Sequence, residues 1–143
     1  MGNSVLYYDN QTVKIENSKI TTSGYFDFSN KSDIIVNNST LTIDDMYRNP
    51  EGGSSNRTSK DYFTNSTITT GYFSNFFTVL DNSTLTTTDS VYYGFIHAKN
   101  SVINMVRLNA LYNLYLEDTS MKVTTNDGTT RIIPDNEAGI ALL

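Results

Sequence analysis

The segment Asn38-Ser39-Thr40-Leu41-Thr42 recurs along the chain and identifies its fold class. The same Asn-Ser-Thr-(Leu/Ile)-Thr pattern occupies residues 65–69 and 82–86, and looser copies begin at Asn3, Asn17, Asn100 and Asp118. Across these seven copies the first position is Asn six times and Asp once, the second is Ser six times and Thr once, and the fourth is always apolar. Such agreement predicts a repeating architecture and does not by itself indicate a chemistry.

The spacing of the copies identifies the kind of repeat. The anchors at residues 3, 17, 38, 65, 82, 100 and 118 are 14, 21, 27, 17, 18 and 18 residues apart. Periods near 20 residues indicate a solenoid, and polarity alternates with period two around each anchor, as in strands. We predict an all-β fold, a single-stranded parallel β-helix (β-solenoid) of about six rungs. The variable spacing favours a right-handed coil.

Each rung is expected to bend at its Asn. Asn tolerates left-handed backbone better than other non-glycine residues, and its amide both donates and accepts hydrogen bonds. Stacked about 4.8 Å apart, these side chains are predicted to form an internal ladder that satisfies a buried bend. The ladder residues are Asn17, Asn38, Asn65, Asn82, Asn100 and Asp118.

This repeat resembles the right-handed parallel β-helix family, pectate-lyase-like and pertactin-like, in which Asn ladders occupy such a bend. It is most similar to the repeat domains of bacterial autotransporter-type surface adhesins. The similarity extends from Asn3 to about Val123. It implies a stiff, secreted or surface-displayed domain.

Composition bounds the function classes. The 143 residues fit one domain, 1–143, and the absence of cysteine excludes disulfides and thiolate zinc sites. The net charge of −5 with no basic cluster argues against nucleic acid. No apolar run reaches the length of a membrane span, and the first residues lack signal-peptide features. We expect part of a longer extracellular or cell-surface protein without cofactor or metal; the sequence does not indicate an oligomeric state.

Two segments interrupt the pattern. Residues 44–61 contain Pro50 and a Gly pair without periodicity, which predicts an inserted loop. The loop contains four carboxylates that could in principle bind calcium: Asp44, Asp45, Glu51 and Asp61. Their spacing is not that of an EF-hand, so a solvated loop without calcium is favoured. The aromatic run 24–28 is expected to fill a connection. Residues 124–143, after a turn signal at 126–128, are predicted to cap the last rung.

The outward positions before each corner form the first candidate binding face. They combine aromatic rings with alternating charges, which suits a glycan or protein partner because rings offer flat apolar area with a polar edge. Ordinary cross-strand pairing on a solvated sheet is the simpler alternative. The candidate residues are Tyr62, Val79, Asp81, His97, Lys99, Tyr115 and Glu117.

The outward positions after each corner form a second face, a T-x-T array. It is similar to the ice-binding face of insect antifreeze β-solenoids, although Lys19, Asn104 and Lys122 interrupt it. The alternative is that Thr is simply a favourable exposed strand residue. The array consists of Thr40, Thr42, Thr67, Thr69, Thr84 and Thr86.

The sequence favours no catalytic residue. Asp81 and Glu117 are predicted two rungs apart, about 9.6 Å, near the upper limit for an inverting carboxylate pair. Lys99 is expected between them, where it lowers a carboxylate pKa that a general acid needs raised. The single histidine, His97, has no nucleophile-elbow motif to accompany it. We therefore expect a non-enzymatic bacterial adhesion or display domain, binding a host glycan, a protein or itself; ice binding and polysaccharide lyase or glycoside hydrolase activity are the alternatives.

Overall fold

The computed structural model describes residues 4–8, 12–29, 33–49, 60–74, 77–89, 94–107, 111–125 and 127–133. These residues form fourteen strands and no helix, so none that could span a membrane. The strands are β1 (Ser4–Tyr8), β2 (Val13–Glu16), β3 (Lys19–Ser29), β4 (Ile34–Asn37), β5 (Thr40–Asn49), β6 (Asp61–Thr64), β7 (Thr67–Ser74), β8 (Phe77–Asp81), β9 (Thr84–Thr87), β10 (Gly94–Lys99), β11 (Val102–Val106), β12 (Leu111–Glu117), β13 (Ser120–Thr124) and β14 (Thr130–Ile133).

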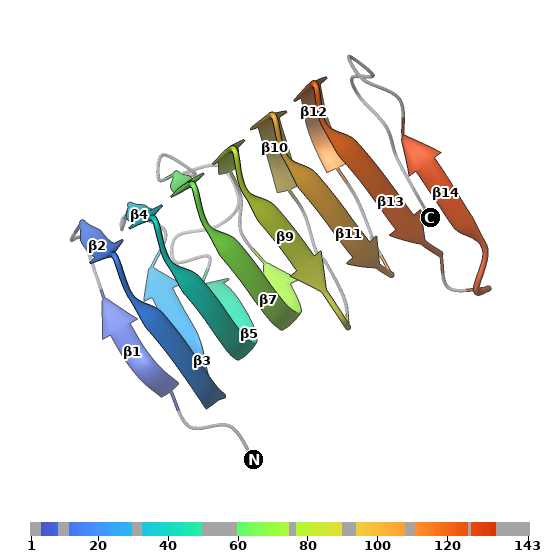
Figure 1. The fold of residues 1–143 in the computed structure, drawn as a ribbon. Coiled ribbons are helices and arrows are strands. Elements are labelled where there is room, and N and C mark those ends of the chain that lie inside the picture. Colours follow the sequence, from blue (N-terminus) through green and yellow to red (C-terminus); the bar gives the residue numbers. More distant parts are fainter. Residues whose placement is uncertain are drawn as a thin grey trace.

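The strands stack into two sheets (Figure 1). One sheet has eight strands in the order β1-β3-β5-β7-β9-β11-β13-β14, and the other has six in the order β12-β10-β8-β6-β4-β2. Every pairing is parallel except that of β13 with β14. The chain therefore passes from one sheet to the other at each corner, and the predicted all-β parallel β-solenoid is confirmed.

Each passage from the six-stranded to the eight-stranded sheet is made at a left-handed residue. The φ angle lies between 48° and 51° at Asn17, Asn38, Asn65, Asn82, Asn100 and Asp118. Residues with a Cβ rarely adopt this conformation, and Asn and Asp are the usual exceptions. The recurring Asn thus has the conformational role that the sequence predicts.

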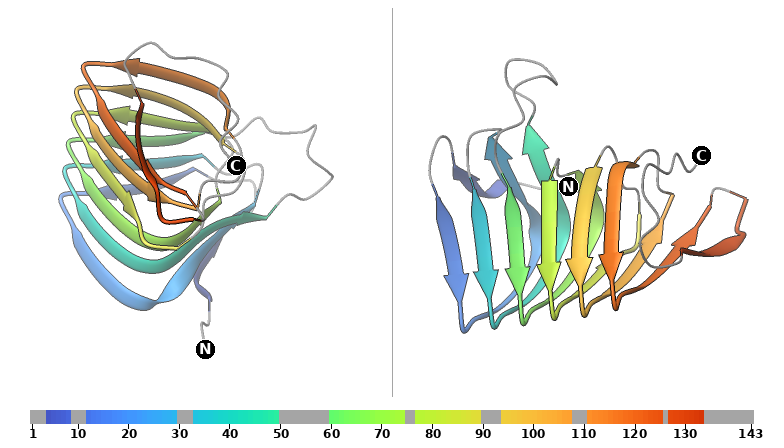
Figure 2. Two further views of the ribbon diagram at one scale, coloured as in Figure 1. Left: turned by 90° about the vertical axis from the view of Figure 1, so that its right-hand side faces the viewer. Right: turned by 90° about the horizontal axis from the view of Figure 1, so that it is seen from above.

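Figure 2 shows the strands of both sheets stacked rung upon rung. The buried residues of the two sheets form one continuous apolar core. The residue three places after the corner is fully buried in Leu41, Ile68, Leu85, Ile103 and Met121. The residue two places before the corner is buried in Ile15, Val36, Phe63, Leu80, Ala98 and Leu116. Burial of one large aliphatic or aromatic side chain contributes about 1.5–3 kcal/mol. Stacked apolar columns therefore stabilise a chain that has no disulfide.

At the corners the side chain that turns inward belongs to the residue after the Asn, which is a serine in most rungs. Ser39, Ser66, Ser83 and Ser101 are each only 4% exposed, whereas all six corner residues are exposed. The Asn ladder is therefore external, and its predicted internal placement is wrong. Asn side chains do bond along the stack: Asn38 Nδ2 donates to Asn17 Oδ1, and Asn82 Nδ2 to Asn65 Oδ1, both at 2.8 Å.

The buried hydroxyls join successive rungs. Ser83 Oγ accepts the backbone N–H of Ser66 at 3.1 Å and donates to the Asp81 carbonyl at 2.8 Å. The interstrand bond repeats with Ser39, Ser66, Ser101 and Thr119 as acceptors. Because buried N–H groups require partners, this hydroxyl ladder satisfies one donor per rung at the bend.

The predicted loop of residues 44–61 is too long. Asp45 and Met46 of β5 pair with Tyr25 and Phe26 of β3 on one side and with β7 on the other, and β5 continues to Asn49. At the far end, Asp61 is already in β6 and fully buried. The aromatic run 24–28, predicted as a connection, lies within β3 and supplies the partner that extends these strands. Residues 50–59 lie outside the described part.

The first repeat does not follow the register of the others. The repeat pattern places Leu6 beside Ile20, but Leu6 pairs with Phe26, and Tyr8 pairs with Phe28. The spacing of 14 residues between the first two anchors is shorter than the 17 or 18 of the shortest later repeats. Strand β1 therefore pairs only with the C-terminal half of β3.

An antiparallel hairpin follows the last corner. Gly128 has a φ of 84°, its N–H donates to the Thr125 carbonyl at 3.0 Å, and β14 returns along β13. The Asp127 carboxylate accepts hydrogen bonds from the Thr125 hydroxyl and from the Thr129 N–H, which lower its pKa to about 2. Strand β14 thus covers the edge of β13, as a cap requires. Residues 134–143 of the predicted cap lie outside the described part.

Candidate binding surfaces

The outer face of the six-stranded sheet brings together the aromatic residues of the first candidate face. In register across β6, β8, β10 and β12, Tyr62 lies beside Val79, Val79 beside His97, and His97 beside Tyr115. The first three are half-buried, and Tyr115 is 48% exposed. The predicted stripe is therefore one continuous surface, most accessible towards the C-terminal rungs.

Ring contacts hold part of this stripe in place. His97 packs edge-on against Phe77, with ring centroids 5.0 Å apart, and against Tyr115 at 5.9 Å. The Lys60 ammonium lies 4.9 Å from the Phe77 centroid, a cation–π contact. Sequence reasoning missed Phe77 and Lys60. Phe77 lies two residues before outward-facing Val79, so the same alternation extended by one step would have found it.

A charged column borders the aromatic residues. Asp81, Lys99 and Glu117 are in register on β8, β10 and β12, and Lys99 Nζ lies 3.5 Å from Glu117 Oε1. Both side chains of this ion pair are about half exposed, so it contributes little stability. Lys99 thus stands between the two carboxylates, as predicted, and forms its ion pair with Glu117.

The threonines of the T-x-T array are in register on the eight-stranded sheet. Thr40 pairs with Thr67 and Thr67 with Thr84, while Thr42, Thr69 and Thr86 form the second row. Thr40, Thr42 and Thr67 are exposed, and Thr69, Thr84 and Thr86 are half-buried. Thr21 extends one row at the N-terminal end, whereas Val102 and Asn104 replace Thr at the C-terminal end.

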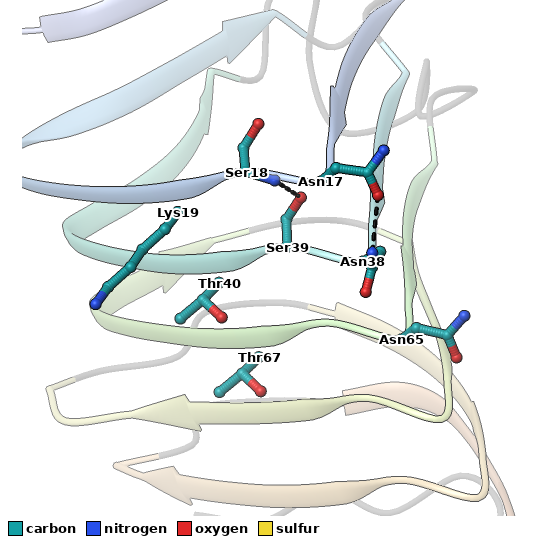
Figure 3. Close-up of a pocket in the computed structure, with 8 residues that line it drawn as sticks. All are labelled: Asn17, Ser18, Lys19, Asn38, Ser39, Thr40, Asn65 and Thr67. Atoms are coloured by element: carbon teal, nitrogen blue, oxygen red, sulfur yellow. Dashed lines mark hydrogen bonds between the residues drawn. The ribbon is translucent and has the colours of Figure 1, made fainter.

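A hollow of about 300 Å³ lies at the corner between the two faces (Figure 3). Its walls are the exposed Asn column on one side and outward-facing Lys19 and threonines on the other, and the inward-turned serines lie between them. All eight lining residues are polar: Asn17, Ser18, Lys19, Asn38, Ser39, Thr40, Asn65 and Thr67. Sequence reasoning missed this hollow because it placed the Asn side chains inside the coil.

The acidic residues of the predicted loop do not form one cluster. Asp44 is exposed, Asp45 accepts the Tyr72 N–H at 3.0 Å, and Asp61 is buried. Glu51 lies outside the described residues. Within the described ranges no three His, Cys, Asp or Glu side chains gather in a way that could hold a metal ion.

The geometry thus offers two polar sheet faces and a hollow at their common corner. No protein-family model, curated protein or solved structure matches the chain.

Proposed function

We propose that this chain is a non-enzymatic adhesion or display domain of a secreted or cell-surface bacterial protein, and that its six-stranded face binds a glycan or a protein surface. The observation that carries the proposal is the exposed ring of Tyr115, held against His97, which itself packs on Phe77. Aromatic rings that are already fixed lose little side-chain entropy when a partner docks.

The charges beside the rings support binding rather than catalysis. A polar rim around an apolar centre is the usual composition of a recognition surface. Lys60, Lys99 and Glu117 supply that rim, on strands or at strand ends whose backbone is fixed by the sheet. The stacked coil holds the rings and charges at constant spacing, so the face is organised before a ligand arrives.

The direct test is binding to a glycan array and to immobilised cell-surface protein, comparing the parent chain with Tyr115→Ala. Loss of one aromatic contact, about 0.5–1.5 kcal/mol, predicts weakening of up to about tenfold. Val102→Ala is the matched control, because Val102 is 41% exposed but lies on the other sheet. Equal binding by both variants, or no binding by the parent chain, would refute the proposal.

The register of the threonines favours a second candidate function, ice binding. Two rows repeat hydroxyl and methyl groups about 7 Å apart along the strands and about 4.8 Å apart across them. Thermal hysteresis that is lost in Thr67→Tyr and retained in Tyr115→Ala would support this candidate. Absence of thermal hysteresis and ice shaping in the parent chain would eliminate it.

A further inference from the structure

We infer that the hollow at the first three corners is a binding site for one acidic sugar unit, a pyranose that carries a carboxylate. This inference goes beyond the proposed function, because the hollow needs neither the rings nor the charges of the six-stranded face.

The alternation of side chains at the corner creates a groove. The Asn at each corner points outward and the following Ser turns inward, with Ser39 and Ser66 buried and Ser18 half-buried. The next residue, Lys19, Thr40 or Thr67, points outward again. Two outward columns separated by one inward column are about 6–7 Å apart along the chain. The hollow of about 300 Å³ has room for a single six-membered ring.

Some polar groups of this groove are not used by the fold. Among the described residues, side-chain bonds join two pairs of successive corners, Asn38 with Asn17 and Asn82 with Asn65. The neighbouring Asn38 and Asn65, which both line the hollow, are not bonded to each other. The backbone stack is continuous there, since Thr67 N–H donates to the Ser39 carbonyl at 3.0 Å. The missing bond between Asn38 and Asn65 leaves an amide acceptor and an amide donor directed to solvent. Within the described chain the Thr40 and Thr67 hydroxyls also make no side-chain hydrogen bond.

Lys19 selects an acidic ligand. It is the one charged residue among the eight that line the hollow, and within the described residues it forms no ion pair. In a chain of net charge −5, an ammonium that forms no such pair is a local site for an anion. Amides and hydroxyls that donate and accept match the vicinal hydroxyls of a sugar. Since no ring is present for stacking, one hollow binds weakly, and affinity comes from repeated copies of the acidic unit on one polymer.

The test is amide chemical-shift mapping with methyl glucuronide and, as its neutral counterpart, methyl glucoside. Glucuronide is expected to shift the amide resonances of four residues at the hollow: Ser18, Lys19, Ser39 and Thr40. Its affinity is expected to be about fivefold higher than that of glucoside, because an exposed ion pair contributes about 1 kcal/mol. Lys19→Gln should remove the difference. Lys122→Gln, an exposed lysine on the same sheet outside the hollow, should retain it.

Two further arms separate this site from the six-stranded face. Raising ionic strength towards 1 M shortens the screening length to about 3 Å and should weaken glucuronide binding towards that of glucoside. Tyr115→Ala should leave the corner shifts unchanged even if it abolishes glycan-array binding. The inference is overturned if both sugars bind equally, if Lys19→Gln binds like the parent chain, or if the shifts map to β10 and β12.

Discussion

Replacement of Ser83 by Ala tests the internal hydroxyl ladder directly. Ser83 is 4% exposed, and its hydroxyl is the acceptor for the backbone N–H of Ser66 at 3.1 Å. The substitution removes one oxygen and leaves the backbone path unchanged. It therefore leaves a buried N–H of the neighbouring rung without its partner.

The expected cost follows from that unpaired donor. Leaving a buried hydrogen-bonding group unsatisfied costs about 1–3 kcal/mol, more than the net value of an average hydrogen bond. The single hydroxyl hydrogen of Ser83 is donated to the Asp81 carbonyl at 2.8 Å, so that carbonyl loses one of its donors as well. We expect Ser83→Ala to lower the free energy of unfolding by about 2 kcal/mol.

Chemical denaturation followed by circular dichroism gives the free energy, and hydrogen exchange of the Ser66 amide gives the local effect. Ser120→Ala is the matched control, because Ser120 is exposed on β13 and should change stability by less than about 0.5 kcal/mol. If the two variants unfold at the same denaturant concentration, and the Ser66 amide exchanges at the parent rate, the ladder contributes no net stability and the reasoning fails.

Three further predictions follow from single positions. Asn100→Ala should destabilise by about 1–2 kcal/mol while Asn100→Gly is neutral, since the φ of 50° is strained for residues with a Cβ; equal melting temperatures would contradict this. Gly71→Ala should lower the melting temperature sharply, because its Cβ would lie 2.5 Å from the Asp44 carbonyl oxygen; Thr69→Ala on the same strand is the control. The Asp127 pKa is lowered from 3.8 to about 2, so the carboxylate's contribution to stability is fully present above about pH 4 and is lost as the pH falls through about 2. An NMR titration of this carboxyl should show a midpoint at about 2. Asp127→Asn should be less stable than the parent chain at pH 7 but not at pH 1.5.

The repeat pattern predicts most of the architecture because its information is local. Because side chains alternate between the two faces of a strand, burial of the apolar residue three places after the Asn fixes the face of every other residue in that strand. Leu41, Ile68 and Leu85 are buried as expected. The long outer halves of β3 and β5 were not predicted. Tyr25 lies in β3 and Met46 in β5, and the outer halves of these two strands are held in the sheet by pairing with each other. The sequence of one segment alone does not show which other segment it will pair with.

Single residues on the outer faces could be assigned to a surface but not to a contact. The sequence places His97 and Tyr115 on one face, and the structure adds the rotamers that bring His97 against Phe77 at 5.0 Å. Ring–ring geometry depends on side-chain torsions, which a strand pattern leaves free. For the same reason the missing side-chain bond between Asn38 and Asn65 has no counterpart in the repeat itself.

The exchanged roles of Asn and Ser have one physical cause. Between the buried residue two places before the corner and the one three places after it, strict alternation fails once. The sequence leaves open whether that break precedes or follows the Asn. A left-handed residue at the corner makes the Asn and the residue before it both outward, as in Asn37 and Asn38, and turns Ser39 inward. Ser is short enough for its hydroxyl to reach the Asn37 carbonyl at 2.9 Å, so the inward place suits it. The same break exposes the asparagines and opens the groove beside them.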